Sequence, residues 1–237
     1  MGPSHKDVRQ FYNDIYYKDL RRSSNDLSGH YSRLAGKLGV ADGSQVLDVA
    51  CGSGEWLKTI RKLSAKVAGI DISDKAIDIC KDEMPDGEFA CGPAESLPFP
   101  DDTFDLVTCL GSLEHFVDQK AAIADMVRVS KPSADVLILV PNAEFLTYRL
   151  GLYKGTNQKD IKETLYSISE WREMFEESGL TVKACWRDLH TLNRSWLMRA
   201  GLPGLPARAL QALLLLVWPL RWQYQVYFLC KLETRRS

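Results

Sequence analysis

A short aliphatic strand that ends in a glycine-rich turn constrains the fold of this chain more than any other feature. Residues Val46 to Ala50 are apolar except for Asp48, and Gly52 and Gly54 follow at once. Glycines at such a turn let the backbone approach a ligand closely, and the helix that opens there presents unpaired N–H groups. The segment therefore predicts a strand–turn–helix unit that binds a cofactor.

The rest of the chain repeats this alternation of strand and helix. Strands are expected over residues 45–50, 66–71, 88–91, 104–110, 136–140, 181–186 and 223–232. Helices are expected over 5–22, 26–38, 55–63, 74–83, about 118–130, and 170–178 with Ser169 as N-cap. The run at 136–140 is nearly all aliphatic, as suits a strand buried on both faces of a parallel sheet. This order of elements indicates a doubly wound α/β fold.

Two details of the glycine turn favour one kind of cofactor over another. A dinucleotide-binding fingerprint would place a third glycine where Leu57 stands. That fingerprint also has no use for Asp48, whereas a carboxylate at the end of a strand can face a cationic amine. The turn therefore favours S-adenosylmethionine, which carries an ammonium group, over NAD.

Taken with three later segments, this turn resembles the class I S-adenosylmethionine-dependent methyltransferases, in the group that includes the ubiquinone/menaquinone methyltransferase-like enzymes. The matching segments are Asp48-x-x-Cys51-Gly52-x-Gly54, Gly69–Ser73, Cys91–Phe99 and Leu110–Phe116. The resemblance implies a Rossmann-like, doubly wound, seven-stranded sheet, mostly parallel with an antiparallel last strand and a helical insertion before that strand. It also implies S-adenosylmethionine as cofactor and S-adenosylhomocysteine as product.

The resemblance distributes the cofactor contacts along the chain. In the family, the loop that starts at Asp48 cradles the methionine part of the cofactor, the acid corresponding to Asp71 holds both ribose hydroxyls, and the segment 91–99 borders the adenine. The family usually has an aspartate at the position of Pro93, which bonds the adenine amino group, and proline cannot make that contact. The expected cofactor-binding residues are Tyr17, Asp48, Ala50, Cys51, Gly52, Gly54, Asp71, Ile72, Ala94, Glu95, Leu110 and Gly111.

The segment after the fourth strand holds the expected catalytic residues. It resembles the family's Leu-Glu-His sequence, where the methionine end of the cofactor meets the acceptor. For a hydroxyl acceptor, His115 is the best-placed general base, with Glu114 as the second catalytic candidate. The alternatives are that His115 only starts the following helix and that Glu114 pairs locally or contacts the cofactor amine. The expected reaction is methyl transfer, as O-methylation, to a small-molecule or lipid-linked acceptor.

Two rival functions stay open, and metal chemistry is not expected. The rivals are a protein that binds S-adenosylmethionine without transferring methyl and, disfavoured by Asp48, an NAD-dependent oxidoreductase. The six cysteines show no CxxC pair and no Cys/His cluster, so we expect no metal site, and we read them as reduced thiols of a cytoplasmic protein.

We expect a single domain over 1–237. Residues 1–40 would form a helical lid in which Tyr12 or Tyr17 contacts the cofactor, and 44–141 would form the cofactor-binding core. The stretches 142–167 and 189–221 interrupt the strand–helix alternation and would shape the acceptor site.

The formal net charge of -1 is the sum of an acidic part and a basic part of the chain. Residues 1–188 hold 23 basic and 30 acidic side chains, whereas 189–237 hold 7 basic and 1 acidic. The acidic first part argues against a nucleic-acid partner.

The apolar run at 209–220 is too short to span a membrane, which takes about 20 residues. We expect 189–221 to form two helices, broken at Leu202–Pro206, that rest on an anionic membrane surface. A homodimer interface and the roof of a pocket remain alternatives.

Overall fold

The structure is a computed structural model, and it describes residues 4–16, 28–149, 151, 163–189 and 201–233. The strands are β1 (Gln45–Val49), β2 (Lys66–Asp71), β3 (Glu88–Cys91), β4 (Phe104–Leu110), β5 (Ser130–Pro141), β6 (Leu180–Arg187) and β7 (Gln225–Leu232). The α-helices are α1 (His5–Phe11), α2 (Ser28–Lys37), α3 (Glu55–Arg61), α4 (Asp74–Glu83), α5 (Gln119–Val129), α6 (Leu146–Arg149), α7 (Ile168–Glu177) and α9 (Gly201–Val217). Shorter turns are the π-helical η1 (Tyr12–Tyr16) and the 3-10 turns η3 (Leu113–His115) and η4 (Leu220–Trp222).

All seven strands form one sheet in the order β3-β2-β1-β4-β5-β7-β6. The pairs from β3 to β5 are parallel, and β7 runs antiparallel to both β5 and β6. This confirms the predicted doubly wound sheet with an antiparallel last strand. Because the parallel strands point the same way, their carboxyl ends and the loops that follow meet at one edge, where α/β sheets bind ligands.

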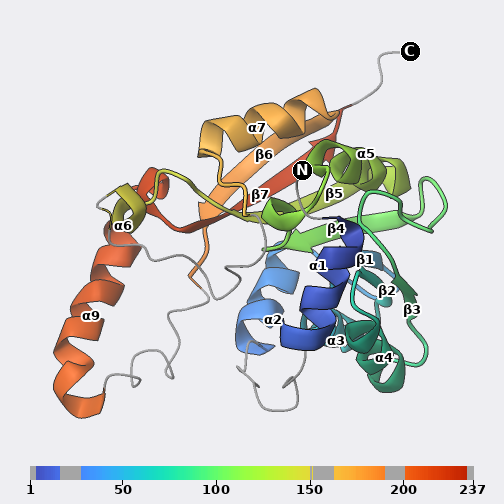
Figure 1. The fold of residues 1–237 in the computed structure, drawn as a ribbon, viewed down its shortest axis with the longest axis horizontal. Helices are drawn as coiled ribbons and strands as arrows, with labels where there is room; N and C mark the ends of the chain where they lie inside the picture. Colours follow the sequence, from blue (N-terminus) through green and yellow to red (C-terminus); the bar gives the residue numbers. More distant parts are fainter. Residues whose placement is uncertain (1–3, 17–27, 150, 152–162, 190–200, 234–237) are drawn as a thin grey trace.

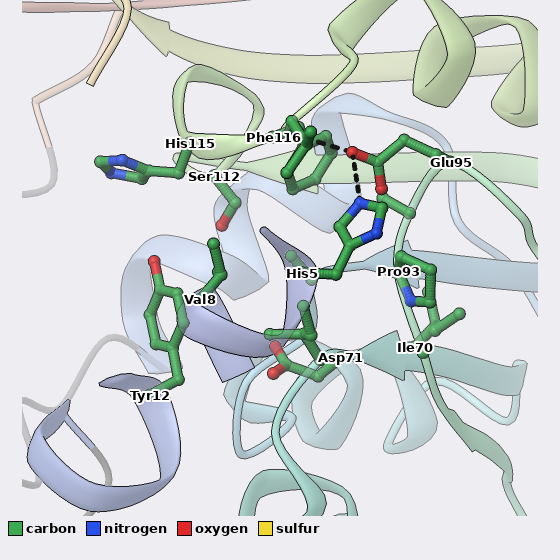
Figure 2. Close-up of a pocket in the computed structure, with 15 residues that line it drawn as sticks. His5, Val8, Tyr12, Ile70, Asp71, Pro93, Glu95, Ser112, His115 and Phe116 are labelled. Atoms are coloured by element: carbon green, nitrogen blue, oxygen red, sulfur yellow. Dashed lines mark hydrogen bonds and ion pairs between the residues drawn. The ribbon is translucent and has the colours of Figure 1, made fainter. Parts of the chain in front are cut away.

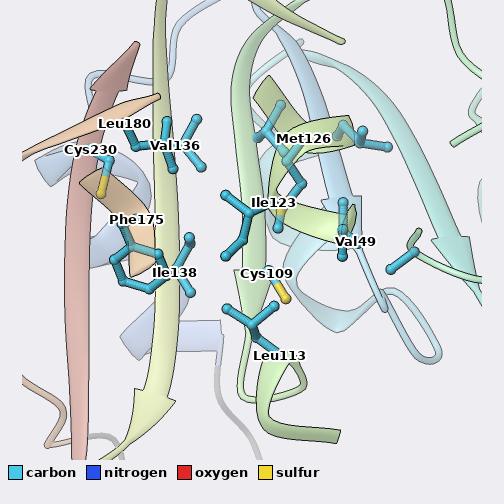
Figure 3. Close-up of a cluster of buried hydrophobic side chains, with 14 of the residues drawn as sticks. Val49, Cys109, Leu113, Ile123, Met126, Val136, Ile138, Phe175, Leu180 and Cys230 are labelled. Atoms are coloured by element: carbon cyan, nitrogen blue, oxygen red, sulfur yellow. The ribbon is translucent and has the colours of Figure 1, made fainter. Parts of the chain in front are cut away.

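The sheet is covered on both faces, and each face has its own apolar core. On one face α5 and α7 place Ile123, Met126 and Phe175 against the sheet, as Figure 3 shows. On the other face α3 contributes Trp56 and α4 contributes Ile77. Alternation along β1 sends Val49 to the first face, whereas Val46 and therefore Asp48 belong to the second. This register decides which side of the sheet each residue at the carboxyl edge faces.

Three local predictions were wrong. The helix expected at 170–178 begins at Ile168, because Ser167 rather than Ser169 is its N-cap and forms a capping box with Glu170. The strand expected at 136–140 begins at Ser130, with a bulge where five residues of β5 match two of β4. No break separates Leu202–Pro206 from the helix that follows it, because α9 runs unbroken from Gly201.

The position of the prolines explains the continuity of α9. Pro203 lies in the first helical turn, where a backbone N–H has no intrahelical partner to lose. Pro206 lies one turn further on and removes a single hydrogen bond near the helix start. The first helix expected in 189–221 falls on residues 190–200, outside the described part. Within that part, no helix is long and apolar enough to cross a membrane.

Candidate functional site

A pocket of about 580 Å³ opens at the carboxyl edge of the sheet (Figure 2). The loops after β1, β2, β3 and β4 form its floor and walls, and α1 with η1 covers it. It is lined by His5, Val8, Tyr12, Ala50, Ile70, Asp71, Ile72, Gly92, Pro93, Ala94, Glu95, Ser112, His115, Phe116 and Val117. Segments far apart in sequence are therefore brought to one cavity, which we call the edge pocket.

The turn after β1 depends on glycine at position 54. Gly54 adopts φ +76°, the left-handed region that L side chains rarely enter. A Cβ atom built there would lie 2.7 Å from Met84 Cε and 3.0 Å from Cys80 Sγ. The glycine thus lets the turn lie tightly against α4 before the chain enters α3.

Asp71 ends β2 and joins this turn to the edge pocket. Its carboxylate accepts backbone N–H bonds from Gly52 and Ser73, each of 2.9 Å. The side chain is buried, and burial raises the pKa of the Asp71 carboxyl, against the lowering effect of its hydrogen bonds. Each carboxylate oxygen keeps a further lone pair, so Asp71 can still accept O–H bonds from a ligand in the pocket.

Asp48 lies behind the pocket rather than among the residues that line it. Thr108 Oγ1 donates a 2.6 Å hydrogen bond to Asp48 Oδ1, and Trp56 Nε1 donates to Thr108 Oγ1 at 3.1 Å. Burial raises the pKa of Asp48 to about 7. A cationic group nearby would favour the charged carboxylate and lower that pKa.

The loop after β3 forms the wall beside Pro93 and Ala94 and is held in place by Glu95. The Glu95 carboxylate accepts N–H bonds from Val117 at 3.0 Å and Asp118 at 3.1 Å. It also lies 3.3 Å from His5 Nε2, which joins the loop to α1 (Figure 2). Glu95 thus holds the pocket wall in place, and its Oε1 atom already has these three partners.

The two predicted catalytic residues, both in η3, occupy different surroundings. His115 is buried and lines the edge pocket. Glu114 is buried away from it, and Glu114 Oε2 has no hydrogen-bond partner among the described residues. Burial raises the pKa of Glu114 to about 8, so the side chain is largely protonated near neutral pH and is poorly suited to act there as a carboxylate base.

The edge pocket is lined by five of the twelve predicted cofactor residues. Ala50, Asp71, Ile72, Ala94 and Glu95 line it, while the predicted Asp48, Cys51, Gly52 and Gly54 support it from behind. The remaining two described positions, Leu110 and Gly111, line a neighbouring cavity. Tyr17 lies outside the described residues.

Helix α1 and η1 supply lining residues, of which the sequence reasoning anticipated only Tyr12. His5, Val8 and Tyr12 are spaced three and four residues apart, which places them on one helical face. That spacing was the available signal for His5 and Val8. Among the described residues, no group of three or more His, Cys, Asp or Glu side chains could hold a metal ion.

The pocket residues fit S-adenosylmethionine. The buried Asp71 carboxylate keeps lone pairs for hydroxyl groups, and Pro93 with Ala94 offers an apolar wall. Pro93 has no side-chain acceptor for an amino group, so that family contact is absent here.

Comparison with known proteins agrees with this fit. The methyltransferase domain family matches residues 47–138. The chain is 28% identical over 177 residues to the uncharacterized methyltransferase YcgJ of Bacillus subtilis, covering 68% of this chain and 66% of that protein. It is 34% identical over 123 residues to the ubiquinone/menaquinone biosynthesis C-methyltransferase UbiE of Geobacter sulfurreducens, covering 48% and 46%. The matches therefore span between about half and two thirds of these relatives' lengths.

A solved structure extends the likeness to nearly the whole fold. It is a chain in the complex between the Haloferax volcanii Trm112 methyltransferase activator and the putative methyltransferase, with a TM-score of 0.72 and 19% identity. The superposition covers 97% of this chain and 99% of that one.

Proposed function

We propose that this chain, whose residues 47–138 belong to the methyltransferase domain family, transfers a methyl group from S-adenosylmethionine to an oxygen atom of a small-molecule or lipid-linked acceptor. The observation that carries the proposal is the edge pocket, where the glycine turn after β1 and the carboxylate ending β2 meet. When bound there, S-adenosylmethionine supplies an electrophilic methyl group on a sulfonium.

The residues of the pocket divide the work of holding this cofactor. Asp71 would accept the two ribose hydroxyls, because its oxygens retain lone pairs beyond the two backbone bonds. The wall at Pro93 and Ala94 would contact the adenine face. Asp48, kept in place by Thr108, would stabilise the ammonium end through its charge rather than by direct lining.

The chain's contribution to rate would come mainly from alignment. A closed, oriented site can supply about 7–11 kcal/mol by holding the reacting atoms together. An acceptor that entered the edge pocket itself would find His115 as the nearest base for its hydroxyl proton.

Calorimetry tests the binding half of the proposal and separates it from its rivals. The chain should bind S-adenosylmethionine and S-adenosylhomocysteine but not NAD, and Asp71→Ala should abolish the heat of binding. Cofactor binding with no product across a panel of hydroxylated acceptors would favour a binding protein without transferase activity. Binding of NAD alone would refute the proposal.

The lipid-linked option rests on α9. Four apolar side chains of this helix are strongly exposed: Leu210 at 59%, Leu213 at 60%, Leu216 at 49% and Val217 at 74%. Figure 1 shows α9 apart from the sheet, at the edge of the molecule. An apolar helix with exposed leucines and nearby arginines, here Arg208 and Arg221, suits the surface of an anionic membrane.

Flotation with liposomes tests this contact. The chain should float with vesicles that contain phosphatidylserine, and the double change of Leu213 and Val217 to serine should leave it at the bottom of the gradient. Leu63→Ser is the matched control, because Leu63 is 41% exposed but follows α3. Equal flotation of all three proteins would refute the membrane contact. A dimer that does not bind vesicles would indicate that the exposed leucines of α9 form a self-association interface.

A further inference from the structure

A second cavity, of about 500 Å³, lies at the same sheet edge beside the edge pocket. Its walls come from the end of β4, from β5, from the start of β7 and from α2. Apolar or aromatic side chains of Tyr31, Leu110, Leu139 and Tyr227 line it, together with the polar groups of His30 and Gln225. The proposed cofactor contacts at Asp71, Pro93 and Ala94 lie in the edge pocket, and of the described residues predicted to bind the cofactor, Leu110 and Gly111 border this second cavity.

Two residues that line this cavity, a histidine and a tyrosine, lie close to a carboxylate behind its wall. His30 Nε2 lies 3.0 Å from Tyr227 Oη and 3.8 Å from Asp188 Oδ1. The His30 side chain is 20% exposed, whereas that of Asp188 is 2% exposed. The two side chains are therefore close enough to form an ion pair when the imidazole carries a proton.

The three groups are held by separate parts of the fold. The backbone N–H of Asp188 donates to the carbonyl of Gln225 at 3.0 Å, which fixes the residue after β6 against β7. The Tyr227 ring stacks on Trp186, with centroids 5.5 Å apart, and also stacks on His30 at 6.3 Å. The contacts to Tyr227 and Asp188 are both made at Nε2, and together with the stacking they orient the imidazole.

The second cavity adjoins the place where the methyl group would be presented. Gly111 lines the second cavity, and the next residue, Ser112, lines the edge pocket. From the other side, Tyr31 packs edge-on against Trp56, with ring centroids 5.5 Å apart, and Trp56 belongs to the hydrogen-bonded chain that ends at Asp48. Both cavities thus flank the ends of β1 and β4.

We propose that the second cavity is the acceptor site and that His30 is the general base, with Asp188 as its positioning residue; this rests on the proposed methyl transfer. The apolar walls and the basic group of His30 fit an aromatic or enolic acceptor with an acidic hydroxyl. His30 takes the hydroxyl proton as the oxygen–methyl bond forms and the methyl–sulfur bond breaks. S-adenosylhomocysteine leaves neutral, and the imidazolium returns its proton to water.

The geometry favours His30 over His115 for this role. His115 lines the edge pocket, where most of the bound cofactor would lie, whereas His30 lines the second cavity, which the predicted cofactor contacts reach at Leu110 and Gly111. The described contacts of His30 also include a buried carboxylate.

The test uses 4-nitrophenol, because its absorption distinguishes the phenol from the phenolate. The control compound is 4-nitroanisole, which has a similar shape but no hydroxyl proton. Both are titrated into the full chain saturated with S-adenosylhomocysteine, at a pH below the pKa of free nitrophenol. The wild type should bind nitrophenol with phenolate absorption and bind nitroanisole at least tenfold more weakly. His30→Gln should lose the phenolate absorption while its affinity for S-adenosylhomocysteine stays unchanged, which also shows that the variant folds.

Three further variants complete the test. His115→Gln should keep the phenolate absorption. Asp188→Asn should reduce it, and Tyr227→Phe should retain binding because the ring remains. Nitrophenol that does not bind, phenolate absorption unaffected by His30→Gln, or its loss in His115→Gln alone would overturn the assignment. A wild type that binds no S-adenosylhomocysteine would instead refute the proposed function, and the acceptor site with it.

Discussion

Replacing Gly54 with alanine tests whether the turn after β1 is as tight as the structure shows. The new Cβ would lie 2.7 Å from Met84 Cε and 3.0 Å from Cys80 Sγ, and the backbone would have to keep φ +76°. The left-handed conformation costs about 1–2 kcal/mol for a residue with a Cβ. Overpacking adds about 1–3 kcal/mol, near the lower end because the end of a methionine side chain can shift. We therefore expect a loss of about 2–4 kcal/mol in the free energy of unfolding.

The chain contains a matched control for the backbone part of this cost. Gly43 has the same φ of +76°, but a Cβ there would meet nothing within 4 Å. Gly43→Ala should therefore cost only about 1–2 kcal/mol. The difference between the two variants in urea unfolding measures the contact with α4 alone.

Two further measurements make the test decisive. A double-mutant cycle of Gly54→Ala with Met84→Ala should be less than additive, because the truncated side chain makes room for the methyl group. Calorimetry should also show weaker binding of S-adenosylmethionine by Gly54→Ala but not by Gly43→Ala. Equal loss of stability in the two glycine variants would refute the close packing, and unchanged cofactor affinity would refute the role of the turn.

Three other changes probe the buried acids at the carboxyl edge. Asp71→Asn replaces one carboxylate oxygen by a donor that faces a backbone N–H, so calorimetry should show cofactor affinity at least tenfold weaker, and unchanged affinity would remove Asp71 from the ribose site. Burial raises the pKa of Glu114 to about 8 from 4.5, so the folded state retains a proton between those values that the unfolded state has lost. The free energy of unfolding should therefore fall by on the order of 2–5 kcal/mol as pH rises through that window. Urea midpoints measured across the window should fall less in Glu114→Gln. An identical pH dependence in the two proteins would contradict the burial. Thr108→Val removes the hydrogen-bond donor of the buried Asp48 carboxylate and should lower the free energy of unfolding in urea by about 1–3 kcal/mol. Little change in that free energy would show that water replaces the hydroxyl.

The sheet could be predicted largely from the sequence, because its signals are local. Aliphatic runs, the glycine turn at 52–54 and the acid ending β2 each lie within a few residues. The antiparallel last strand came from the family resemblance, since no local pattern gives the direction of 225–232. The errors also arose where local signals compete, as with the two serines 167 and 169 that could both cap α7.

The candidate site was predictable only in part for the same reason. Residues on the glycine turn and on the loops after β2 and β3 carry motifs, whereas His5 and Val8 show only helical spacing. The group formed by His30, Asp188 and Tyr227 carries no sequence motif. His30 precedes both of its partners by more than 150 positions in the chain. Such a group exists only once the sheet has closed.

The position of β7 has a consequence for the order in which this protein can fold. It is the last strand of the described sheet in chain order, yet it lies between β5 and β6. During synthesis, β6 would emerge before the strand that joins it to the rest of the sheet. Until residues 225–232 leave the ribosome, the edges of β5 and β6 remain unpaired and exposed to other chains. Completion of the sheet therefore waits for residues 225–232, and aggregation through the two open edges competes with folding until they pair.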